Sequence, residues 1–402
     1  MTSSIFAAVE MAPRDPILGL NEAFNADPRS TKVNLGVGVY FDDNGKIPLL
    51  AAVKAAEEAR LKAAPPRGYQ PIEGLGAYNT AVQNLLFGKD SSLLANGQVV
   101  TAEALGGTGA LKIGADYLKR LNPAAKVYIS DPSWENHRAL FESAGFLVEN
   151  YPYYDAATRG VNFAGMKACL GALPAGSIVV LHACCHNPTG ADLSDAQWAE
   201  VVAVCQERGL VPFLDMAYQG FADGIDADAV AVRAFSASGL QFFASSSFSK
   251  NFSLYGERVG ALSIVTASKD EAARVMSQLK RVIRTNYSNP PTHGGALVAA
   301  VLASPELRQM WETELAGMRD RIRAMRTGLV DAIKAQGVAQ DFSFVVTQRG
   351  MFSYTGLTAA QVERMKDEFG IYAVSTGRIC LAALNSKNLD YVAQAIATVT
   401  KA

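Results

Sequence analysis

The sequence predicts an α/β protein that has a mostly parallel central sheet in a large domain, followed by a smaller α+β domain. Apolar runs of strand length, such as 126–130, 177–183 and 210–215, are separated by helical segments of about 10 to 15 residues. Helices between strands call for parallel pairing with right-handed crossovers. At 402 residues the chain also exceeds the size at which a single core stops growing, so we expect two domains.

The division between the domains follows a change in this pattern. A long helical stretch runs from about Pro305 to Gln336, as one helix or as two with a bend near Gly317. We expect three segments: an N-terminal arm that also contributes to the small domain (1–46), a large domain (47–305), and a small C-terminal domain with its linking helix (306–402). In the tail, the strand-like pieces are 342–346, 351–354 and 379–382, and the helical pieces are 359–368 and 389–398.

Charge and composition exclude several classes of protein. The formal net charge is -1, so no basic field attracts nucleic acid or acidic lipid, and we expect neither as a partner. The N-terminus lacks the basic region and apolar run of a signal peptide, and no segment approaches about 18 uninterrupted apolar residues. We therefore expect a cytoplasmic protein that does not bind membranes. Five scattered cysteines without framework spacing point to reduced thiols.

The N-terminal part supplies two features that bear on a binding site. Residues 33–40 form an extended segment containing Gly36 and Gly38, where a ligand or another backbone can come close. A helix is expected over 48–63, with proline near its start and good helix formers throughout. The next prolines end this helix and leave Tyr69 in a loop, where a half-buried loop aromatic is the alternative to a functional one.

Two turns are candidates for ligand binding. Gly106–Gly109 opens a helix, and glycines beside unpaired first-turn amides suit a phosphate. The stretch lacks a Walker lysine and the full dinucleotide fingerprint, so by itself it is a weak signal. Asp131–Trp134 is the turn after the 126–130 strand, at the edge where ligands collect in open α/β sheets. Trp134 and His137 should lie near such a pocket, although a tryptophan is more often simply core.

The strand at 210–215 ends on a carboxylate. Asp215 is followed closely by Tyr218, and a charge at the end of an apolar run is usually paired or functional because burying it alone is costly. A capping box at 194–197 begins the helix before this strand. The segment His182–His186 offers imidazoles and thiols as zinc ligands, but no second cluster gives the usual spacing and the segment continues an apolar run. We expect no metal site.

The stretch Ser245–Arg258 concentrates hydroxyls, one amine and one guanidinium. It lies between two apolar runs, 240–244 and 259–265, that read as buried strands, so Lys250 should sit in a polar connection held on a rigid scaffold. A lysine amine is a nucleophile toward carbonyls once deprotonated, and the charge of Arg258 would lower its pKa. Serine hydroxyls and an arginine also make a phosphate cradle. The alternative is a solvated lysine in a serine-rich loop.

Together these features match the needs of pyridoxal 5'-phosphate. Its aldehyde requires a lysine, its pyridine nitrogen a carboxylate, and its phosphate amides, hydroxyls and a guanidinium. The sequence resembles the fold-type I pyridoxal-phosphate aminotransferases, specifically the aspartate and aromatic aminotransferases of subgroup Iα, over nearly its whole length. The motifs that carry the resemblance are 33–38, 106–111, 131–137, 186–190, 215–221, 247–251, 257–260 and 286–291.

The resemblance implies the three-layer transferase fold of aspartate aminotransferase and a role for each candidate residue. Lys250 would form a Schiff base with the cofactor and then, as general acid and base, move the proton between the substrate Cα and the cofactor C4'. Asp215 would pair with the pyridinium nitrogen. Tyr218 and Asn187 would hydrogen-bond the phenolic oxygen of the cofactor. The residues expected around the ring are Trp134, which stacks on it, and His137 and His182, which lie behind Asp215.

The resemblance also assigns the residues that bind anions. Arg378 would grip the substrate α-carboxylate, assisted by Asn187 and by the backbone at Gly36 to Gly38. From the neighbouring subunit, Arg284 would bind a side-chain carboxylate and Tyr69 would reach the phosphate. Residues supplied across an interface imply a homodimer with shared active sites. On the same subunit, the phosphate would be held by Gly107, Thr108, Ser247 and Arg258.

Departures from the family pattern bear on the substrate. Phe41 and Ile47 stand where aspartate-specific relatives carry a lysine and a threonine, and they resemble the apolar lining of aromatic aminotransferases. Three other residues remain of the aspartate type: Val39, Thr108 and Asn289. Apolar area favours aromatic side chains, while Arg284 retains dicarboxylates. We expect ping-pong transamination of aromatic (Tyr, Phe) and acidic (Asp, Glu) amino acids with 2-oxoglutarate. The alternatives are a strict aspartate aminotransferase, a pyridoxal-phosphate lyase or decarboxylase, and a non-enzymatic ligand-sensing module.

Overall fold

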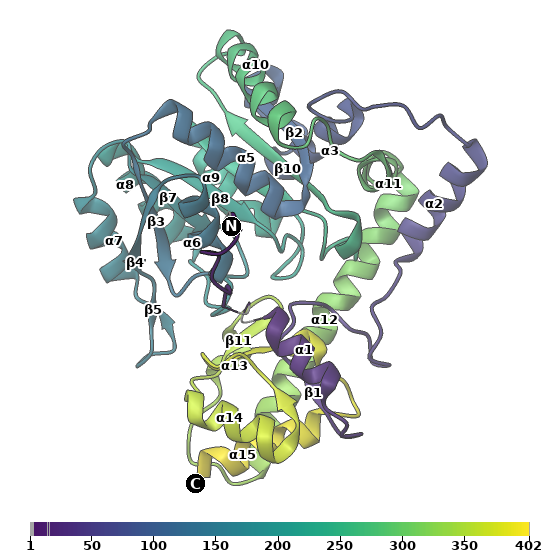
Figure 1. The fold of residues 1–402 in the computed structure, drawn as a ribbon, viewed down its shortest axis with the longest axis vertical. Helices are drawn as coiled ribbons and strands as arrows, with labels where there is room; N and C mark the ends of the chain where they lie inside the picture. The colour runs from purple at the N-terminus through teal and green to yellow at the C-terminus, as the bar shows by residue number, and fades with distance from the viewer. Residues whose placement is uncertain (1–3, 14, 16, 402) are drawn as a thin grey trace.

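A computed structural model describes residues 4–13, 15 and 17–401. The molecule has a larger part built on a central sheet and a smaller part below it in the view of Figure 1. Helix α12 (Pro305–Ala335) begins beside the larger part and runs down into the smaller one, so it belongs to both (Figure 1). It continues through Gly317 as one helix of 31 residues, which decides between the two expected arrangements.

The central sheet has seven strands in the order β2-β10-β9-β8-β7-β3-β4. All neighbours pair in parallel except β10, which is antiparallel to both β2 and β9. The expectation of a mostly parallel sheet is therefore confirmed. The strands are β2 (Val99–Leu105), β3 (Lys126–Asp131), β4 (Leu147–Pro152), β7 (Ile178–His182), β8 (Val211–Met216), β9 (Phe242–Ser247) and β10 (Val259–Val265).

Helices cover both faces of this sheet, which gives the three layers. Successive side chains of a strand point to opposite faces, so Ile178 and Val180 enter one hydrophobic cluster while Val179 and Leu181 enter the other. Both faces of β7 are thus apolar, as expected for a strand buried between helices. One face is covered by α5 (Gly106–Leu121), α6 (Glu135–Ser143) and α10 (Lys269–Asn286), and the other by α3 (Gly76–Phe87), α7 (Phe163–Ala172), α8 (Asp195–Arg208) and α9 (Val230–Ala237).

Local sequence signals fix the ends of several helices. The predicted capping box is present at the start of α8, where the Ser194 hydroxyl accepts from the Gln197 amide and the Gln197 side chain accepts from the Ser194 amide. Gly209 ends the same helix in the left-handed region at φ 60°. The remaining elements of the large part are α2 (Ala51–Ala63), α4 (Ser92–Ala95), α11 (Thr292–Ala303) and the strand pair β5 (Tyr154–Asp155) and β6 (Gly160–Val161).

The smaller part combines both ends of the chain. Strand β1 (Val33–Asn34) pairs in parallel with β12 (Ile371–Tyr372), and β11 (Phe352–Tyr354) pairs antiparallel with β13 (Arg378–Cys380). Strand β1 thus pairs with a strand from the C-terminal region, and the division into three segments stays a prediction. The helices here are α1 (Leu18–Ala26), α13 (Phe344–Thr347), α14 (Ala359–Phe369) and α15 (Leu389–Lys401), of which α15 packs on α12.

Two expected strands differ from the structure. Residues 342–346 were expected as a strand, but 344–347 form the helical turn α13. Phe342 and Val345 are buried while Val346 is exposed. Buried residues three positions apart are typical of a helical turn, whereas a strand would bury every second residue. The strand expected at 240–244 lies at Phe242–Ser247, because the serines continue the ladder with β10.

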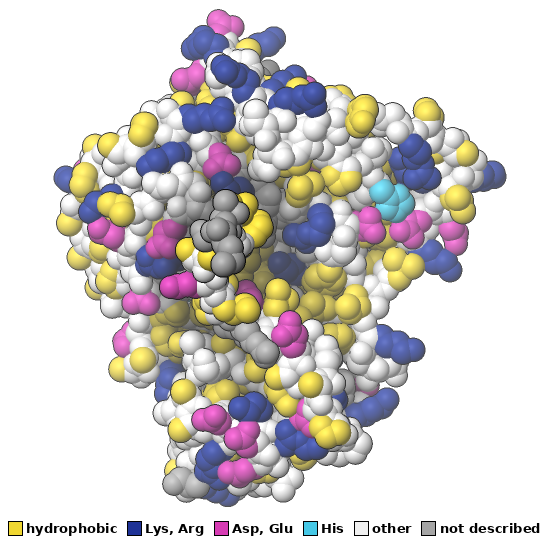
Figure 2. All heavy atoms as spheres, in the orientation of Figure 1, with side chains coloured by type: hydrophobic (Ala, Val, Ile, Leu, Met, Phe, Trp, Pro, Cys, Tyr) yellow, Lys and Arg dark blue, Asp and Glu magenta, His cyan; other side chains and the backbone are white. Residues whose placement is uncertain are grey.

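The surface shows mixed charge. Basic and acidic side chains are interspersed over the face in Figure 2, and hydrophobic side chains gather in the hollow between the larger and smaller parts. This matches the nearly neutral net charge of the sequence. Within residues 4–13, 15 and 17–401, no helix has the length and apolar character required to cross a bilayer.

Candidate active site

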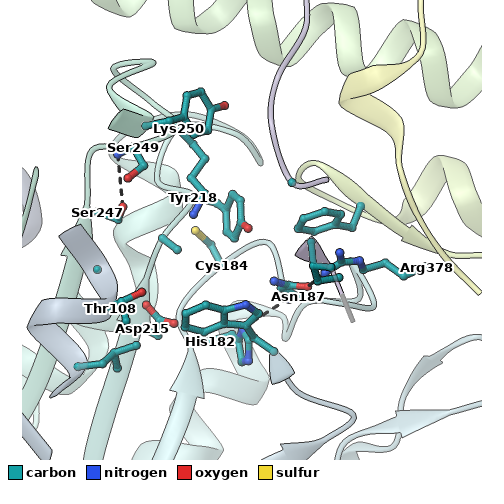
Figure 3. Close-up of a pocket in the computed structure, with 18 of the residues that line it drawn as sticks. Thr108, His182, Cys184, Asn187, Asp215, Tyr218, Ser247, Ser249, Lys250 and Arg378 are labelled. Atoms are coloured by element: carbon teal, nitrogen blue, oxygen red, sulfur yellow. Dashed lines mark hydrogen bonds between the residues drawn. The ribbon is translucent and has the colours of Figure 1, made fainter. Parts of the chain in front are cut away.

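A cavity of about 250 Å³ lies at the carboxyl ends of the parallel strands, where the small part meets the sheet (Figure 3). Ligands of open α/β sheets bind at this edge. Twelve of the residues singled out from the sequence line the cavity, and they come from separate motifs: Gly38, Gly107, Thr108, Trp134, His182, Asn187, Asp215, Tyr218, Ser247, Lys250, Arg258 and Arg378.

The antiparallel strand β10 explains how a phosphate cradle forms at this edge. Strand β10 is antiparallel to β2, so the start of β10 lies beside the end of β2. Arg258, which precedes β10, therefore lies beside Gly106, which follows β2. The Gly106 amide donates to the Arg258 carbonyl at 3.0 Å. A Cβ at Gly106 would lie 2.5 Å from the Arg258 guanidinium, and the φ of +70° also favours glycine. The first turn of α5, Ser247 and Arg258 thus lie together at the cavity, where their amides, hydroxyl and guanidinium can bind an anion.

Asp215 ends β8 as a buried, doubly hydrogen-bonded carboxylate. His137 Nε2 donates to its Oδ2 at 2.9 Å, and Ser245 Oγ donates to its Oδ1 at 2.9 Å. Burial alone would raise the pKa of Asp215, but the hydrogen bonds and the charges of the nearby imidazoles outweigh burial and hold this pKa below its ordinary value. Behind them, Ser133 Oγ lies 2.9 Å from His137 Nδ1 and 3.2 Å from His182 Nε2. Asp215 therefore stays ionised.

Lys250 lies in the turn after β9 and faces the cavity. Its Nζ is 4.8 Å from the centroid of the Tyr218 ring, toward which the side chain points in Figure 3. Burial lowers the pKa of Lys250 to about 8; the Asp215 carboxylate opposes this shift and the Arg258 charge adds to it. A substantial share of the amine is therefore neutral near pH 8, as a nucleophile or general base requires.

Arg378 is buried with part of its guanidinium unused. Nη1 donates to Asn187 Oδ1 at 3.0 Å and Nη2 donates to the Gly36 carbonyl at 2.8 Å, while the Phe352 ring lies against the guanidinium with its centroid at 4.4 Å. Glu135 is the nearby carboxylate, at 3.8 Å. Within the described part of the chain, the buried Nε has no hydrogen-bond partner. A buried donor of this kind beside a cavity suits an incoming carboxylate.

Tyr69 and Arg284, expected from the neighbouring subunit, lie outside the cavity of the single chain. Tyr69 is 96% exposed, and Arg284 is exposed at the end of α10 with its guanidinium donating to the Ser288 hydroxyl. Phe41 and Ile47, the two residues that suggested an aromatic pocket, do not line the cavity of the single chain either. Their expected roles stay predictions.

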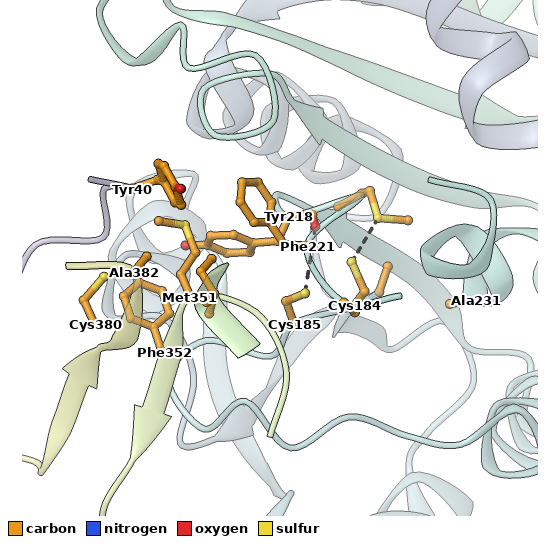
Figure 4. Close-up of a cluster of buried hydrophobic side chains, with 14 of the residues drawn as sticks. Tyr40, Cys184, Cys185, Tyr218, Phe221, Ala231, Met351, Phe352, Cys380 and Ala382 are labelled. Carbon is orange, nitrogen blue, oxygen red and sulfur yellow. Dashed lines mark hydrogen bonds between the residues drawn. The ribbon is translucent and has the colours of Figure 1, made fainter. Parts of the chain in front are cut away.

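Sequence reasoning missed several lining residues. Phe352 and Tyr255 contribute aromatic walls, and a Cβ at Gly38 would lie 2.7 Å from the Phe352 ring. Figure 4 shows Tyr218 and Phe352 close together in the core beside the cavity, with their ring centroids 5.9 Å apart in an edge-to-face arrangement. The pairing of Tyr354 with Arg378 in β11 and β13 brings Phe352 here, and that register is not visible in the sequence.

The His182–His186 segment includes a group with metal-ligand chemistry. One ligand atom each from Cys184, Cys185 and Asp228 lies within 4.8 Å of the others. The Asp228 carboxylate, however, accepts four backbone amides of the loop at 220–224, at 2.7 to 3.3 Å. The carboxylate oxygens of Asp228 are therefore already occupied by hydrogen bonds from that loop, and we propose no metal site there.

Comparison with known proteins identifies the family. The family model for aminotransferase class I and II matches residues 30–396. The chain belongs to this family. It is 69% identical over 396 residues to an aspartate aminotransferase of Pseudomonas aeruginosa and 51% identical over 397 residues to an aromatic-amino-acid aminotransferase of Escherichia coli, with 98% of this chain and 100% of each relative covered.

A solved structure extends this likeness to the fold. An aromatic-amino-acid aminotransferase from Burkholderia pseudomallei, covalently bound to pyridoxal phosphate, is 72% identical with a TM-score of 0.97, covering 99% of this chain and 100% of that one. The expected fold, enzyme class and cofactor are thereby confirmed. The site fits this cofactor on its own geometry. A Cβ at Gly106 would crowd the Arg258 guanidinium in the phosphate cradle, and an ionised carboxylate and a lysine of lowered pKa line the same cavity.

Proposed function

We propose that this aminotransferase exchanges amino groups between aromatic or acidic amino acids and 2-oxoglutarate by a ping-pong mechanism. The observation that carries the proposal is one cavity containing a lysine of lowered pKa, an ionised carboxylate and a buried arginine with a free Nε donor. Lys250, Asp215 and Arg378 are the groups that a transaminase needs for proton transfer, cofactor binding and substrate binding, respectively.

The cofactor would be held at both ends. Gly107, Thr108, Ser247 and Arg258 would bind its phosphate through amides, hydroxyls and a guanidinium. At the other end, the ionised Asp215 would hold a protonated ring nitrogen, and Trp134 would pack on the ring. When bound, pyridoxal 5'-phosphate supplies an electron sink that stabilises negative charge at the substrate Cα.

Proton transfer would fall to Lys250. Because its pKa is about 8, a substantial share of the amine is neutral near that pH, and it would take the proton from the substrate Cα and deliver it to the carbon that was the cofactor's aldehyde. Tyr218 would hydrogen-bond the cofactor's phenolic oxygen together with Asn187. Burial raises the pKa of Tyr218, so its hydroxyl keeps the proton that it donates.

The substrate α-carboxylate would bind to Arg378. The Asn187 side chain and the Gly36 carbonyl hold two of its nitrogens at 3.0 and 2.8 Å and fix the plane of the guanidinium. The unpartnered Nε would then meet a carboxylate oxygen. Because Arg378 and Lys250 line the same cavity, a substrate bound in this way would present its Cα to Lys250, and such positioning contributes to the rate.

A homodimer with shared active sites is part of the proposal. Tyr69 and Arg284 are exposed on the single chain, as residues that complete a partner's site would be. The partner subunit's Arg284 would bind the distal carboxylate of acidic substrates and swing aside for an aromatic ring. A cytoplasmic location, expected from the sequence, also stays part of the proposal.

The substrate range of this aminotransferase has two candidates. Relatives at high identity carry both names, aspartate aminotransferase at 69% and aromatic-amino-acid aminotransferase at 51%. Both reactions need Arg378, and only the acidic substrates need Arg284. A strict aspartate aminotransferase is the second candidate, favoured by the more similar of these two relatives.

One experiment tests the cofactor assignment and a second tests the substrate range. Borohydride reduction of the loaded enzyme and peptide mass mapping should place the cofactor mass on the peptide containing Lys250, and attachment elsewhere would contradict the proposal. Single-turnover kinetics with aspartate, glutamate, tyrosine and phenylalanine should show conversion with all four. Conversion by the acidic pair alone would establish the strict aspartate enzyme.

A further inference from the structure

We propose that Ser245 is a positioning residue for the cofactor's ring nitrogen, because its hydroxyl holds the second oxygen of the Asp215 carboxylate. The inference rests on the proposed function, in which Asp215 meets that nitrogen. Ser245 does not line the cavity and would act only through Asp215.

The sheet register places this hydroxyl. Strands β8 and β9 are parallel neighbours, and Asp215 is the register partner of Ser245. Paired residues on adjacent strands project from the same face of a sheet, so their side chains meet. Ser245 is fully buried, and its Oγ donates to Asp215 Oδ1 at 2.9 Å. Since an ionised carboxylate only accepts, the hydroxyl must be the donor.

The hydrogen bond complements the one from His137. The imidazole of His137, on α6, holds Oδ2, while Ser245, on β9, holds Oδ1. Donors on both oxygens, fixed to two different elements, prevent rotation of the carboxylate about its Cβ–Cγ bond. The other ionisable groups that interact with this carboxylate line the cavity: His182, Cys184, Tyr218 and Lys250. Ser245 therefore helps to keep one carboxylate edge turned toward the ring nitrogen.

The same donor also favours the ionised form of Asp215. A protonated carboxyl would accept more weakly from the Ser245 hydroxyl, so the hydrogen bond stabilises the charged state, and an ionised partner in turn favours a protonated ring nitrogen. Without the hydroxyl, Oδ1 would lose its donor in a site that water does not reach readily. We expect the ring nitrogen to be held less firmly as a result.

Strand β9 provides a matched control. Ser245, Ser246 and Ser247 follow one another, and successive side chains alternate between the faces. Ser246 is also buried, but its Oγ has no hydrogen-bond partner among residues 4–13, 15 and 17–401. Ser246→Ala thus removes the same atom from the same strand without touching Asp215.

The test compares two cofactors. Dissociation constants are measured for pyridoxal 5'-phosphate and for its analogue with a carbon in place of the ring nitrogen, using wild type, Ser245→Ala and Ser246→Ala. Ser245→Ala should weaken the natural cofactor by about tenfold, as for loss of a hydrogen bond to a charged group, and should change binding of the analogue by less than about twofold. Ser246→Ala should leave both constants within about twofold of wild type.

A second readout follows the nitrogen itself. The cofactor is labelled with nitrogen-15 at its ring nitrogen, and the nitrogen chemical shift reports the fraction that is protonated. At the same pH this fraction should be smaller in Ser245→Ala than in wild type. Ser245→Thr keeps the hydroxyl and should restore the wild-type fraction. Equal weakening of both cofactors, or an unchanged nitrogen shift in Ser245→Ala, would overturn the inference. Failure of the wild type to bind the natural cofactor would overturn the proposed function as well.

Discussion

Replacing Arg378 by alanine should weaken every amino-acid substrate by a similar factor. Arg378 is 2% exposed and its guanidinium is held by two hydrogen bonds. Among the residues that the structure describes, its Nε has no partner and could donate to a carboxylate. Removing one partner of a buried, hydrogen-bonded charge pair costs on the order of 2 to 5 kcal/mol, or roughly 30-fold to several-thousand-fold in the half-reaction constant. All amino acids carry the α-carboxylate, so aspartate and phenylalanine should lose about equally.

Arg284→Ala provides the contrast for this prediction. It should lower the half-reaction constants of aspartate, glutamate and 2-oxoglutarate by a factor in the same range and change that of phenylalanine little, since only the former carry a distal carboxylate. The assay is single-turnover kinetics with aspartate and phenylalanine on both variants, followed by cofactor absorbance. If Arg378→Ala affects only one donor, or Arg284→Ala reduces both equally, the assignment of the two arginines is refuted.

Three further predictions concern the lysine and the dimer. Lys250→Ala should abolish steady turnover while the protein still folds and binds cofactor without a covalent link, and near-normal turnover would end the assignment. In the cofactor-free enzyme the pKa of Lys250 is about 8, whereas its ordinary value is 10.5, so the folded state loses this proton at a lower pH than the unfolded state does. The free energy of unfolding should therefore rise between pH 8 and 10.5, by about 3 kcal/mol relative to Lys250→Met. Parallel curves of unfolding free energy against pH for the two proteins, measured by urea unfolding, would contradict this. Mixing Lys250→Ala with Arg284→Ala chains should regenerate one competent site per heterodimer for acidic substrates, and absence of activity after demonstrated chain exchange would count against shared sites.

Local sequence signals were enough to predict the fold class and to predict that several candidate residues meet at one edge of the sheet. Asp215 and Lys250 follow apolar runs at strand ends, and parallel strands bring such positions to one edge whatever the details of packing. The glycines at 106–109 likewise mark a turn that only small residues permit. These signals are local, so the sequence displays them directly.

What the sequence did not reveal depends on pairing between distant segments. Phe352 reaches the cavity through the register of β11 with β13, and Ser245 reaches Asp215 through the register of β9 with β8. The helical turn at 344–347 was expected as a strand because a short apolar run carries too few residues to distinguish the two periods. Tyr69 is exposed and lies outside the cavity of its own chain, so the role expected for it at a neighbouring subunit's site depends on an interface between chains.

The half-reaction of the loaded enzyme with glutamate tests the central claim most directly. Wild type and Lys250→Ala are mixed with glutamate, and cofactor absorbance and released 2-oxoglutarate are recorded together. The account predicts that the wild type converts its cofactor to the amine form with one equivalent of 2-oxoglutarate per site, and that Lys250→Ala does so at least about a thousandfold more slowly. No conversion by the wild type, or equal rates in the two proteins, would contradict it.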